Sequence, residues 1–458
     1  MSNMNSEIFR EYDIRGTAKT DLTNEVVENI GKAYGTLIHN NGGKKVAIGK
    51  DNRESSPRLF DALVKGITSI GIDVVSIGEA LTPELYYAVY TLDVDGGINI
   101  TGSHNPPEYN GFKILVGKTA IYGSQIQEIR EIIDAKKFHK SEETGKITEQ
   151  NINEKYINEI VSKTKTGRKL KIVVDAGNGM ASDLGPILMK KLGCEVIELY
   201  CEKITGFPNH IPDPSQEENV IELMKKVVEE KADFGIAFDG DVDRLGVVDE
   251  KGVLIFGDQL LGILAADALK RNPKGKVIFE VKCSQGLSEW IEKNNGIPLM
   301  WKTGHSLIKA KIKEENALIA GEMSGHMYFA ENWYGVDDAL VAASRVVEIF
   351  SNTTKTVSEA VSEMPYYVVS PEYRVDFSDS EKFDFIKKCQ DYFSENYDTI
   401  TVDGARVNFE NGWALIRASN TQQKLIVRME GTSKDALAEI KEKFLSEIEK
   451  FSGKKISL

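Results

Sequence analysis

Three aspartates alternate in one short loop: Asp239, Asp241 and Asp243. The loop lies between two apolar segments, Phe234–Phe238 and Leu245–Val248, that are expected to be strands. Carboxylates with this spacing can converge on one hard cation, and ligands that are all oxygen favour Mg²⁺ or Ca²⁺. An EF-hand is excluded because Arg244 stands where that loop needs Gly and because both flanks are strand-like. The loop therefore predicts a divalent metal site with positions left open for a phosphate oxygen.

A second loop, residues 101–106, presents a single serine hydroxyl. It follows a short apolar strand at 97–100 and reads Thr-Gly-Ser-His-Asn-Pro. Gly102 frees the backbone, and two consecutive prolines beginning at Pro106 prevent a helix or an inner strand. We therefore predict a rigid, exposed loop that carries Ser103. Without the other polar loops of the chain, such a serine would be interpreted as an ordinary turn residue.

Two glycine-flanked loops carry further polar side chains. Residues 303–306 open a helix after an apolar strand, so their amides and His305 could face an anion. Glu322 and Ser324 alternate after a short strand at 317–320, so both side chains can point to one side, as paired sugar hydroxyls require. A capping histidine and a plain turn are the ordinary alternatives.

A hairpin tip near the C-terminus is rich in hydrogen-bond donors. It carries Arg417, Ser419, Asn420 and Thr421 between two apolar strands. An arginine with several small polar side chains provides the donors that a phosphate needs. The alternative is an asparagine-containing hairpin turn without a ligand.

The surrounding elements repeat. A chain of 458 residues is too long for one core, so three or four domains are expected. The pattern strand, loop, helix, glycine, strand occurs at 45–77, 171–199 and 276–301, which indicates three related α/β units with parallel strands. The last part alternates strands and helices in an α+β order. The predicted domains are 1–150, 151–252, 253–365 and 366–458.

Composition narrows the class of partner. A formal net charge of −13 argues against nucleic acid, because such binders carry a basic footprint. No apolar run is long enough to span a membrane, and the polar N-terminus lacks the features of a secretory signal. Four scattered cysteines without a Cys-x-x-Cys pair favour a reducing cytoplasm.

The motifs occur together in one order and spacing. They are Tyr-Asp-Ile-Arg-Gly at 12–16, Thr-Gly-Ser-His-Asn-Pro at 101–106, Asp-Gly-Asp-x-Asp-Arg at 239–244, Trp-Lys-Thr-Gly-His-Ser at 301–306, Gly-Glu-Met-Ser-Gly-His at 321–326 and Arg-Ala-Ser-Asn-Thr at 417–421. Along its whole length the chain resembles the α-D-phosphohexomutase superfamily, and within it the bacterial phosphomannomutase/phosphoglucomutase branch.

The resemblance implies three related α/β domains with mixed sheets and a C-terminal α+β domain, arranged around a central cleft. It implies that Ser103 is a phosphoserine whose phosphate binds Mg²⁺ together with Asp239, Asp241 and Asp243. The other catalytic residues it implies are Arg15, His104, Lys113, Arg244 and His326. The substrate-binding residues it implies are Tyr12, Lys282, His305, Glu322, Ser324, Arg417, Ser419, Asn420 and Thr421.

The implied reaction is the reversible conversion of a mannose or glucose 1-phosphate to the 6-phosphate. Phosphorylated Ser103 would give its phosphoryl group to O6, forming a 1,6-bisphosphate that also serves as activator. The general base is open among His326, Lys113 and His104. The implied partners are small sugar phosphates, with neither nucleic acid nor membrane, and the implied assembly is a monomer or homodimer.

Three alternatives remain. A phosphoglucosamine mutase would use the same mechanism, although Met323 resembles the mannose/glucose branch and Gln is typical there of the glucosamine branch. A metal-dependent sugar phosphatase or serine hydrolase is disfavoured because there is no Gly-x-Ser-x-Gly elbow and because the adjacent side chains of Ser103 and His104 are expected to diverge. A sensor without activity would bind sugar phosphates and not convert them. Val242 departs from the family pattern, where Gly is commoner.

Overall fold

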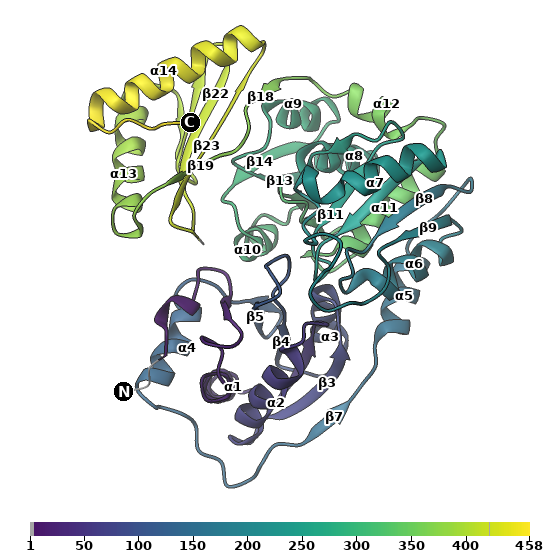
Figure 1. Cartoon of the computed structure of the whole chain (residues 1–458), viewed down its shortest axis with the longest axis vertical. Coiled ribbons are helices and arrows are strands. Elements are labelled where there is room, and N and C mark those ends of the chain that lie inside the picture. The colour runs from purple at the N-terminus through teal and green to yellow at the C-terminus, as the bar shows by residue number, and fades with distance from the viewer. Residues whose placement is uncertain (1–3, 421) are drawn as a thin grey trace.

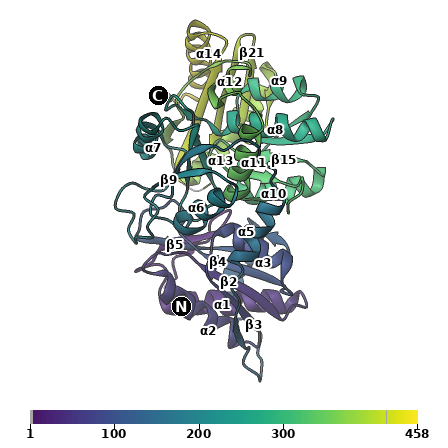
Figure 2. The ribbon, with the colours of Figure 1, turned by 90° about the vertical axis from the view of Figure 1, so that its right-hand side faces the viewer.

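The computed structural model describes residues 4–420 and 422–458. Four β-sheets follow one another along the chain, each flanked by helices. In Figure 1 they form an arc in which the C-terminal sheet, in yellow, lies opposite the N-terminal one, in purple. The side view in Figure 2 has the same two domains at opposite ends of the molecule. The two middle domains connect them.

The first sheet orders its strands β1-β5-β4-β2-β3-β7, with β6 paired to β5. Its strands are β1 (Ile14–Thr17), β2 (Lys45–Lys50), β3 (Asp73–Glu79), β4 (Gly96–Ile100), β5 (Tyr109–Val116), β6 (Thr119–Ala120) and β7 (Ile147–Glu149). Its helices are η1 (Ser6–Ile8), α1 (Asn24–Asn40), α2 (Ser56–Thr68), α3 (Thr82–Thr91) and α4 (Ser124–Asp134).

The second and third sheets have five strands each. The second comprises β8 (Lys171–Asp175), β9 (Glu195–Leu199), β10 (Phe234–Phe238), β11 (Leu245–Val248) and β12 (Leu254–Ile255), with α5 (Asn153–Ser162), α6 (Ala181–Lys191) and α7 (Glu217–Glu230). The third comprises β13 (Lys276–Glu280), β14 (Ile297–Trp301), β15 (Ile319–Gly321), β16 (Met327–Phe329) and β17 (Val336–Asp337), with α8 (Gly257–Arg271), α9 (Gln285–Lys293), α10 (His305–Glu315), α11 (Ala339–Ser351) and α12 (Val357–Ser362).

The fourth sheet is antiparallel throughout its pairings. Its strands are β18 (Val368–Val369), β19 (Tyr373–Asp376), β20 (Thr399–Ile400), β21 (Ala405–Phe409), β22 (Gly412–Ala418) and β23 (Lys424–Gly431). Its helices are α13 (Asp379–Asn396) and α14 (Lys434–Ser452). This is the α+β arrangement predicted for the C-terminal part.

The first three sheets share one topology. In each, a central strand pairs in parallel with two neighbours, and an antiparallel strand follows: β3-β2-β4-β5, β9-β8-β10-β11 and β14-β13-β15-β16. The repeated α/β unit predicted from the sequence is therefore confirmed, and each sheet is mixed. The repeat places one loop after the last parallel strand of each domain.

Local sequence explains the elements. Residues 172–174 are an unbroken apolar run, as expected for a parallel strand covered on both faces, and all three are buried. Helix α1 begins after Thr23, whose side chain accepts a hydrogen bond from Val26 N, and α13 begins after the similar cap Ser378.

One apolar core joins the first three domains. It extends from Leu85 in α3 through Ile172 and Phe234 in the second sheet to Val346 in α11. The fourth domain has a separate core between its sheet and its two helices. It is attached to the third domain through Arg406, which is 1% exposed and donates to the carbonyl oxygens of Val281 (2.6 Å) and Cys283 (2.7 Å).

Within the part of the chain that the structure describes, no helix is both long and apolar enough to cross a bilayer.

Glu84 makes the stability of the fold depend on pH. Its side chain is buried beside this shared core, and burial raises the pKa of its carboxyl from 4.5 to about 7. Oε2 accepts from Leu81 N at 2.9 Å, whereas Oε1 has no hydrogen-bond partner among the described residues. Between about pH 4.5 and 7 the folded protein binds a proton that the unfolded chain releases. Stability from this group is therefore lost as pH rises through that window.

Glu84→Gln keeps the acceptor and removes the charge. We expect its melting temperature to match that of the wild type at pH 5 and to exceed it at pH 8. The corresponding gain in the free energy of unfolding at pH 8 should be at most about 3 kcal/mol. Thermal unfolding at both pH values measures the difference. Glu128→Gln, at an exposed position of α4, is the control and should show no such dependence. A Glu84→Gln difference that is equal at both pH values would contradict the assignment.

Candidate active site

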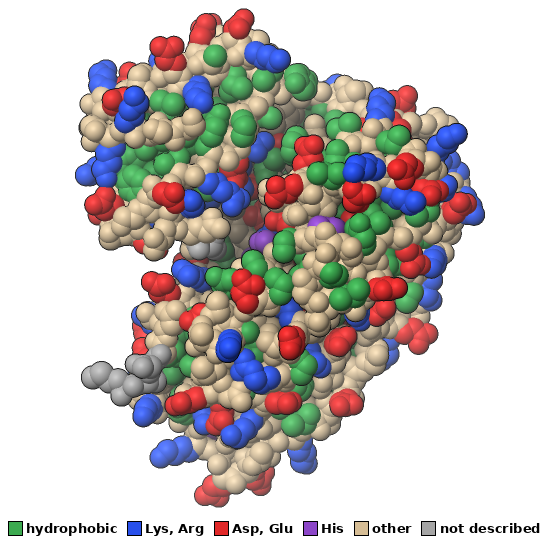
Figure 3. Space-filling view, in the orientation of Figure 1, with side chains coloured by type: hydrophobic (Ala, Val, Ile, Leu, Met, Phe, Trp, Pro, Cys, Tyr) green, Lys and Arg blue, Asp and Glu red, His purple; other side chains and the backbone are tan. Residues whose placement is uncertain are grey.

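The predicted loops occupy equivalent positions in the three related sheets. They are the connections β4–β5, β10–β11 and β15–β16, each at the carboxyl end of the last parallel strand. The fourth loop is the β22–β23 hairpin. Figure 3 shows a hollow between the C-terminal domain and the rest of the molecule, with a histidine side chain visible at its inner edge. The repeat thus directs one loop from each of the first three domains to a common cleft, and the hairpin adds a loop from the fourth.

Ser103 is buried, so the prediction of an exposed loop is wrong for this residue. Its exposed fraction is 3%. Its Oγ donates to Asp239 Oδ2 at 2.7 Å and lies 3.0 Å from His104 Nδ1. The expectation that the Ser103 and His104 side chains diverge is also wrong. It holds for extended backbone, whereas Ser103 has a left-handed conformation with φ of 49°.

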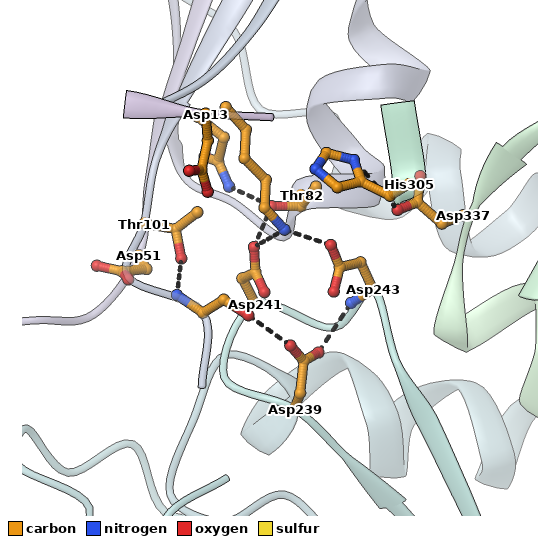
Figure 4. Close-up of polar contacts among 12 residues, drawn as sticks. Asp13, Asp51, Thr82, Thr101, Asp239, Asp241, Asp243, His305 and Asp337 are labelled. Carbon is orange, nitrogen blue, oxygen red and sulfur yellow. Dashed lines mark hydrogen bonds and ion pairs between the residues drawn. The ribbon is translucent and has the colours of Figure 1, made fainter. Parts of the chain in front are cut away.

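The three loop aspartates converge, as Figure 4 shows. One carboxylate oxygen from each of Asp239, Asp241 and Asp243 lies within 4.8 Å of the others, and all three residues are 0% exposed. Asp239 Oδ1 accepts from the backbone of Asp243 at 3.0 Å. The Oδ1 atoms of Asp241 and Asp243 are buried without a hydrogen-bond partner among the described residues. These free oxygens fit a divalent cation, so the triad could bind a metal ion.

Lys113 on β5 balances part of this charge. Its Nζ contacts Asp241 Oδ2 at 2.7 Å and also Asp243 Oδ2. Although burial disfavours the ammonium, the two carboxylates raise the pKa of Lys113. In turn, despite burial, Lys113 lowers the pKa of Asp243 to about 2. Burial and the neighbouring carboxylates raise the pKa of Asp239, although the charges of Arg244 and Lys113 oppose the rise.

Val242 stands between two of the aspartates in a strained conformation. Its φ is 69°, a left-handed value that a β-branched residue rarely adopts. Its side chain is fully buried in the main core. Compared with Gly, Val242 therefore has a strained backbone but adds apolar contacts to the core. The carboxylates of its neighbours Asp241 and Asp243 still converge.

Three further cationic or imidazole side chains surround Ser103. Arg15 on β1 donates to Asn105 Oδ1 of the serine loop and pairs with Asp13, each at 2.5 Å. Arg244 ends the metal loop and donates from Nε to His326 Nε2 at 3.1 Å. Burial and the charge of Arg244 lower the pKa of His104, so its ring is held neutral beside the serine hydroxyl.

His326 joins the sugar loop to the metal loop. Its Nδ1 lies 3.2 Å from Asp337 Oδ2 and 3.6 Å from Asp243 Oδ1. Asp337 also pairs with Lys309 at 2.6 Å, and Lys309 contacts His305 Nδ1 at 3.1 Å. A buried network therefore connects His305 with His326.

The predicted sugar-binding residues lie beside this network. Glu322 is 2% exposed and accepts from Gly304 N at 2.8 Å and from Tyr328 Oη at 2.6 Å. Ser324 is half-buried two residues further along. His305 begins α10, as predicted. The carboxylate of Glu322 thus fixes the loop at 303–306 against the loop at 321–326.

The predicted phosphate loop lies on the fourth domain. Arg417 is 5% exposed and pairs with Asp403 at 2.9 Å. Ser419 Oγ accepts from Gln422 N at 3.1 Å, and Asn420 Nδ2 donates to Tyr12 Oη at 2.5 Å. Thr421 lies outside the described residues. These residues form a second group, separate from the cluster around Ser103.

Tyr12 and Lys282 connect the second group to other domains. The Tyr12 hydroxyl donates to Thr303 O at 2.9 Å, so one side chain of the first domain contacts both the third and the fourth. Lys282 Nζ lies 3.2 Å from Glu372 Oε2 of the fourth domain. Although burial opposes it, the charge of Glu280 raises the pKa of Lys282, which is therefore an ammonium.

Sequence reasoning missed several residues of the site. They are Thr82, which donates to Asp241 at 2.5 Å, the pair Lys309 and Asp337, Asp403, and Lys382, which donates to Ser419 O at 2.6 Å. Lys309 stands four residues after His305 on one helix face, so helical spacing could have identified it. The other contacts join residues distant in sequence and carry no local signal.

Four family models match the chain in order. They are described as phosphoglucomutase/phosphomannomutase alpha/beta/alpha domains I, II and III, matching residues 6–140, 154–252 and 256–367, and the C-terminal domain, matching residues 372–447.

Curated relatives and a crystal structure agree with these matches. A phosphomannomutase/phosphoglucomutase of Pseudomonas putida is 43% identical over 444 residues, which is 96% of this chain and 95% of that protein. A phosphoglucomutase of Neisseria gonorrhoeae is 40% identical over 98% of both chains. The crystal structure of a phosphoglucomutase/phosphomannomutase family protein from Burkholderia thailandensis superposes with a TM-score of 0.94 at 39% identity, covering 99% of each chain.

The metal affinity of the triad can be tested without assuming any particular reaction. Asp241→Asn removes one charge and leaves Lys113 without one partner, so we expect the affinity for Mn²⁺ to fall at least about tenfold. About tenfold is the smallest loss that is typical when a contact outside the ligand shell is removed, and loss of a ligand charge should cost no less. Titration followed by electron paramagnetic resonance measures the affinity. Asp183→Asn, whose side chain is 60% exposed, is the control. Equal affinity in the wild type and both variants would exclude the triad as the metal site.

Proposed function

The chain belongs to the phosphoglucomutase/phosphomannomutase family, and we propose that its cleft interconverts hexose 1-phosphates and hexose 6-phosphates through a phosphoryl group carried on Ser103. The observation that carries the proposal is the buried Ser103 hydroxyl, 2.7 Å from Asp239 in the acidic triad. A serine beside a divalent site, with Lys113, Arg15 and Arg244 nearby, suits phosphoryl transfer, which needs positioning and charge neutralisation.

Mg²⁺ is the cation that the oxygen ligands favour, and when bound it would offset the negative charge of the phosphoryl group. Asp239, Asp241, Asp243 and the phosphate on Ser103 would hold it. The remaining charge is met by the chain itself. Lys113 stays an ammonium, and Arg15 and Arg244 add two guanidinium groups whose charges act on His104 of the serine loop.

The proposed transfer consists of two half-reactions, and bonds and protons balance in each. In the first, O6 of a hexose 1-phosphate attacks phosphorus and loses its proton to a base, while the bond from phosphorus to Ser103 Oγ breaks and Oγ takes up a proton. The product is a 1,6-bisphosphate. After the sugar turns over, Ser103 Oγ loses its proton to a base and attacks the phosphorus on O1, the bond from phosphorus to O1 breaks, and O1 takes up a proton. The same bisphosphate activates unphosphorylated enzyme.

The surroundings narrow the choice of base. Lys113 is a poor candidate because its carboxylate neighbours keep it protonated. His104 is held neutral and lies 3.0 Å from Ser103 Oγ, so it can accept a proton at the transferring oxygen. His326, joined to Asp337, is the other candidate.

Turning the sugar over requires a second phosphate site. Arg417, Ser419, Asn420 and Thr421 would hold whichever phosphate is not reacting, with Lys282 and His305 nearby. Glu322 and Ser324 would bind sugar hydroxyls in both orientations, and Tyr12 would close the cleft between them. We further propose mannose and glucose as the sugars, a cytoplasmic location that suits four free thiols, and a monomer or homodimer as the working unit.

The Ser103–His104 contact also favours one rival. A serine hydrogen-bonded to a histidine is a feature of hydrolases, so a sugar phosphatase has to be tested directly. Against it, the Ser103 hydroxyl donates its hydrogen bond to Asp239 Oδ2, at 2.7 Å, and not to the histidine.

We expect the purified protein, with Mg²⁺ and a trace of glucose 1,6-bisphosphate, to convert mannose and glucose 1-phosphates to 6-phosphates. Ser103→Ala should reduce conversion to background because the transferring oxygen is absent. Coupled dehydrogenase assays measure the 6-phosphates, and a colorimetric assay measures free phosphate. Preference for glucosamine 1-phosphate would support the phosphoglucosamine mutase alternative. Release of free phosphate without 6-phosphate would mean a phosphatase, and binding without turnover would mean a sensor.

Arg417→Ala tests the distal phosphate site. Loss of a charge-assisted contact is worth roughly 1.5–3 kcal/mol, so we expect KM to rise about 10- to 100-fold with a smaller change in kcat. Steady-state kinetics with glucose 1-phosphate measure both. Lys387→Ala removes a cation from α13 of the same domain, where the side chain is 68% exposed, and should leave KM unchanged. An unchanged KM in Arg417→Ala would remove Arg417 from the site.

A further inference from the structure

Arg53 makes an unusual set of contacts for a residue without an assigned role. It lies between β2 and α2 and is 3% exposed. Its two terminal nitrogens donate four hydrogen bonds to backbone carbonyls of the segment that carries Ser103. The acceptors are Ser103 O (2.7 Å), Asn105 O (2.6 Å), Pro106 O (2.7 Å) and Tyr109 O (3.0 Å).

The segment offers few backbone donors for these carbonyls, although Pro106 O also accepts from Tyr109 N at 3.0 Å. Ser103, Asn105 and Pro106 lie between β4 and β5, so ladder hydrogen bonds do not satisfy their carbonyls, and the prolines remove two amide donors. Ser103 is also held at φ of 49°, a conformation that costs free energy unless its surroundings impose it. A guanidinium that binds four carbonyls at once supplies that constraint.

Gly102 lets the guanidinium approach. A Cβ atom at this position would lie 2.6 Å from Arg53 Cζ, so only glycine leaves room for the cation. The amide of Gly102 donates to Asp51 Oδ2 at 3.1 Å, and the same oxygen pairs with Arg53 Nε at 3.2 Å. Asp51 therefore anchors both the arginine and the loop.

The second domain covers the other side. Arg53 Cζ lies 5.1 Å from the centroid of the Phe207 ring, a cation–π contact. The arginine is thus fixed by Asp51, by the loop and by an aromatic ring, and the carbonyl face of Ser103 is immobilised while its hydroxyl points to Asp239.

We propose that Arg53 is a positioning residue that fixes the backbone of Ser103 so that Oγ stays aligned with the metal loop during phosphoryl transfer. This inference rests on the proposed transfer through Ser103. A misplacement of about 1 Å costs roughly 100-fold in rate. Because Arg53 binds the protein backbone and not the substrate, its loss should act on kcat and leave KM nearly unchanged.

The test compares kcat and KM of the full-length wild type, Arg53→Ala and Arg53→Lys with glucose 1-phosphate, Mg²⁺ and glucose 1,6-bisphosphate. Arg58→Ala is the matched control. Arg58 lies in the first turns of α2 and also binds backbone carbonyls, those of Leu22 (3.1 Å) and Ala18 (2.6 Å), but it does not contact the serine loop. Melting temperatures report folding, and added guanidinium chloride at a non-denaturing concentration tests chemical rescue.

We expect Arg53→Ala to lower kcat about 100-fold, with KM within about threefold. Guanidinium should restore part of the lost rate, and Arg53→Lys should be intermediate because a point cation cannot satisfy the four carbonyls. Arg58→Ala should keep kcat within about threefold whatever its melting temperature. If Arg53→Ala does not fold, the Arg53→Lys kcat decides.

A kcat within about threefold of wild type in the folded Arg53 variants would overturn the inference, as would an equal loss of kcat in Arg58→Ala. A selective rise in KM would overturn it too, because that would place Arg53 at the substrate. These outcomes require an active wild type, so they are distinct from failure of the proposed function. A wild type that produces no 6-phosphate would overturn both.

Discussion

The balance of charge around Ser103 is the constraint on which the rest of the structure depends. Three carboxylates with no solvent exposure lie within one loop, and burial of like charges is strongly unfavourable unless cations are placed against them. Lys113 comes from the first domain and Arg244 from the second, and the third contributes the His326 ring, whose Nδ1 lies 3.6 Å from Asp243 Oδ1. The domains have to meet for the cluster to be stable, and the apolar core that they share holds them together.

The repeated topology explains how distant residues reach one place. The same β-strand connection, used three times, delivers the serine, the metal loop and the sugar loop. The fourth domain has its own core and contributes Arg417 from a hairpin. In the proposed reaction, the phosphate that is held while the sugar turns over would therefore be bound by a domain that packs separately from the three that surround Ser103. Tyr12 bridges the two parts.

The sequence predicted the repeated α/β units and the chemical type of each loop, because strand periodicity and clustered polar residues are local signals. It did not predict the burial of Ser103 or its contact with His104, because both follow from a left-handed backbone and from packing between domains. Arg53 stayed undetected for the same reason, since its four acceptors lie about fifty residues away.

The central claim is that Ser103 carries the phosphoryl group. The most direct measurement incubates the protein with glucose 1,6-bisphosphate labelled with ³²P on both phosphates, locates the label by peptide mass spectrometry, and then adds unlabelled glucose 1-phosphate. The account predicts label on Ser103 alone, discharged into glucose 1,6-bisphosphate and 6-phosphate. Label on another residue, no label, or discharge as inorganic phosphate would contradict it.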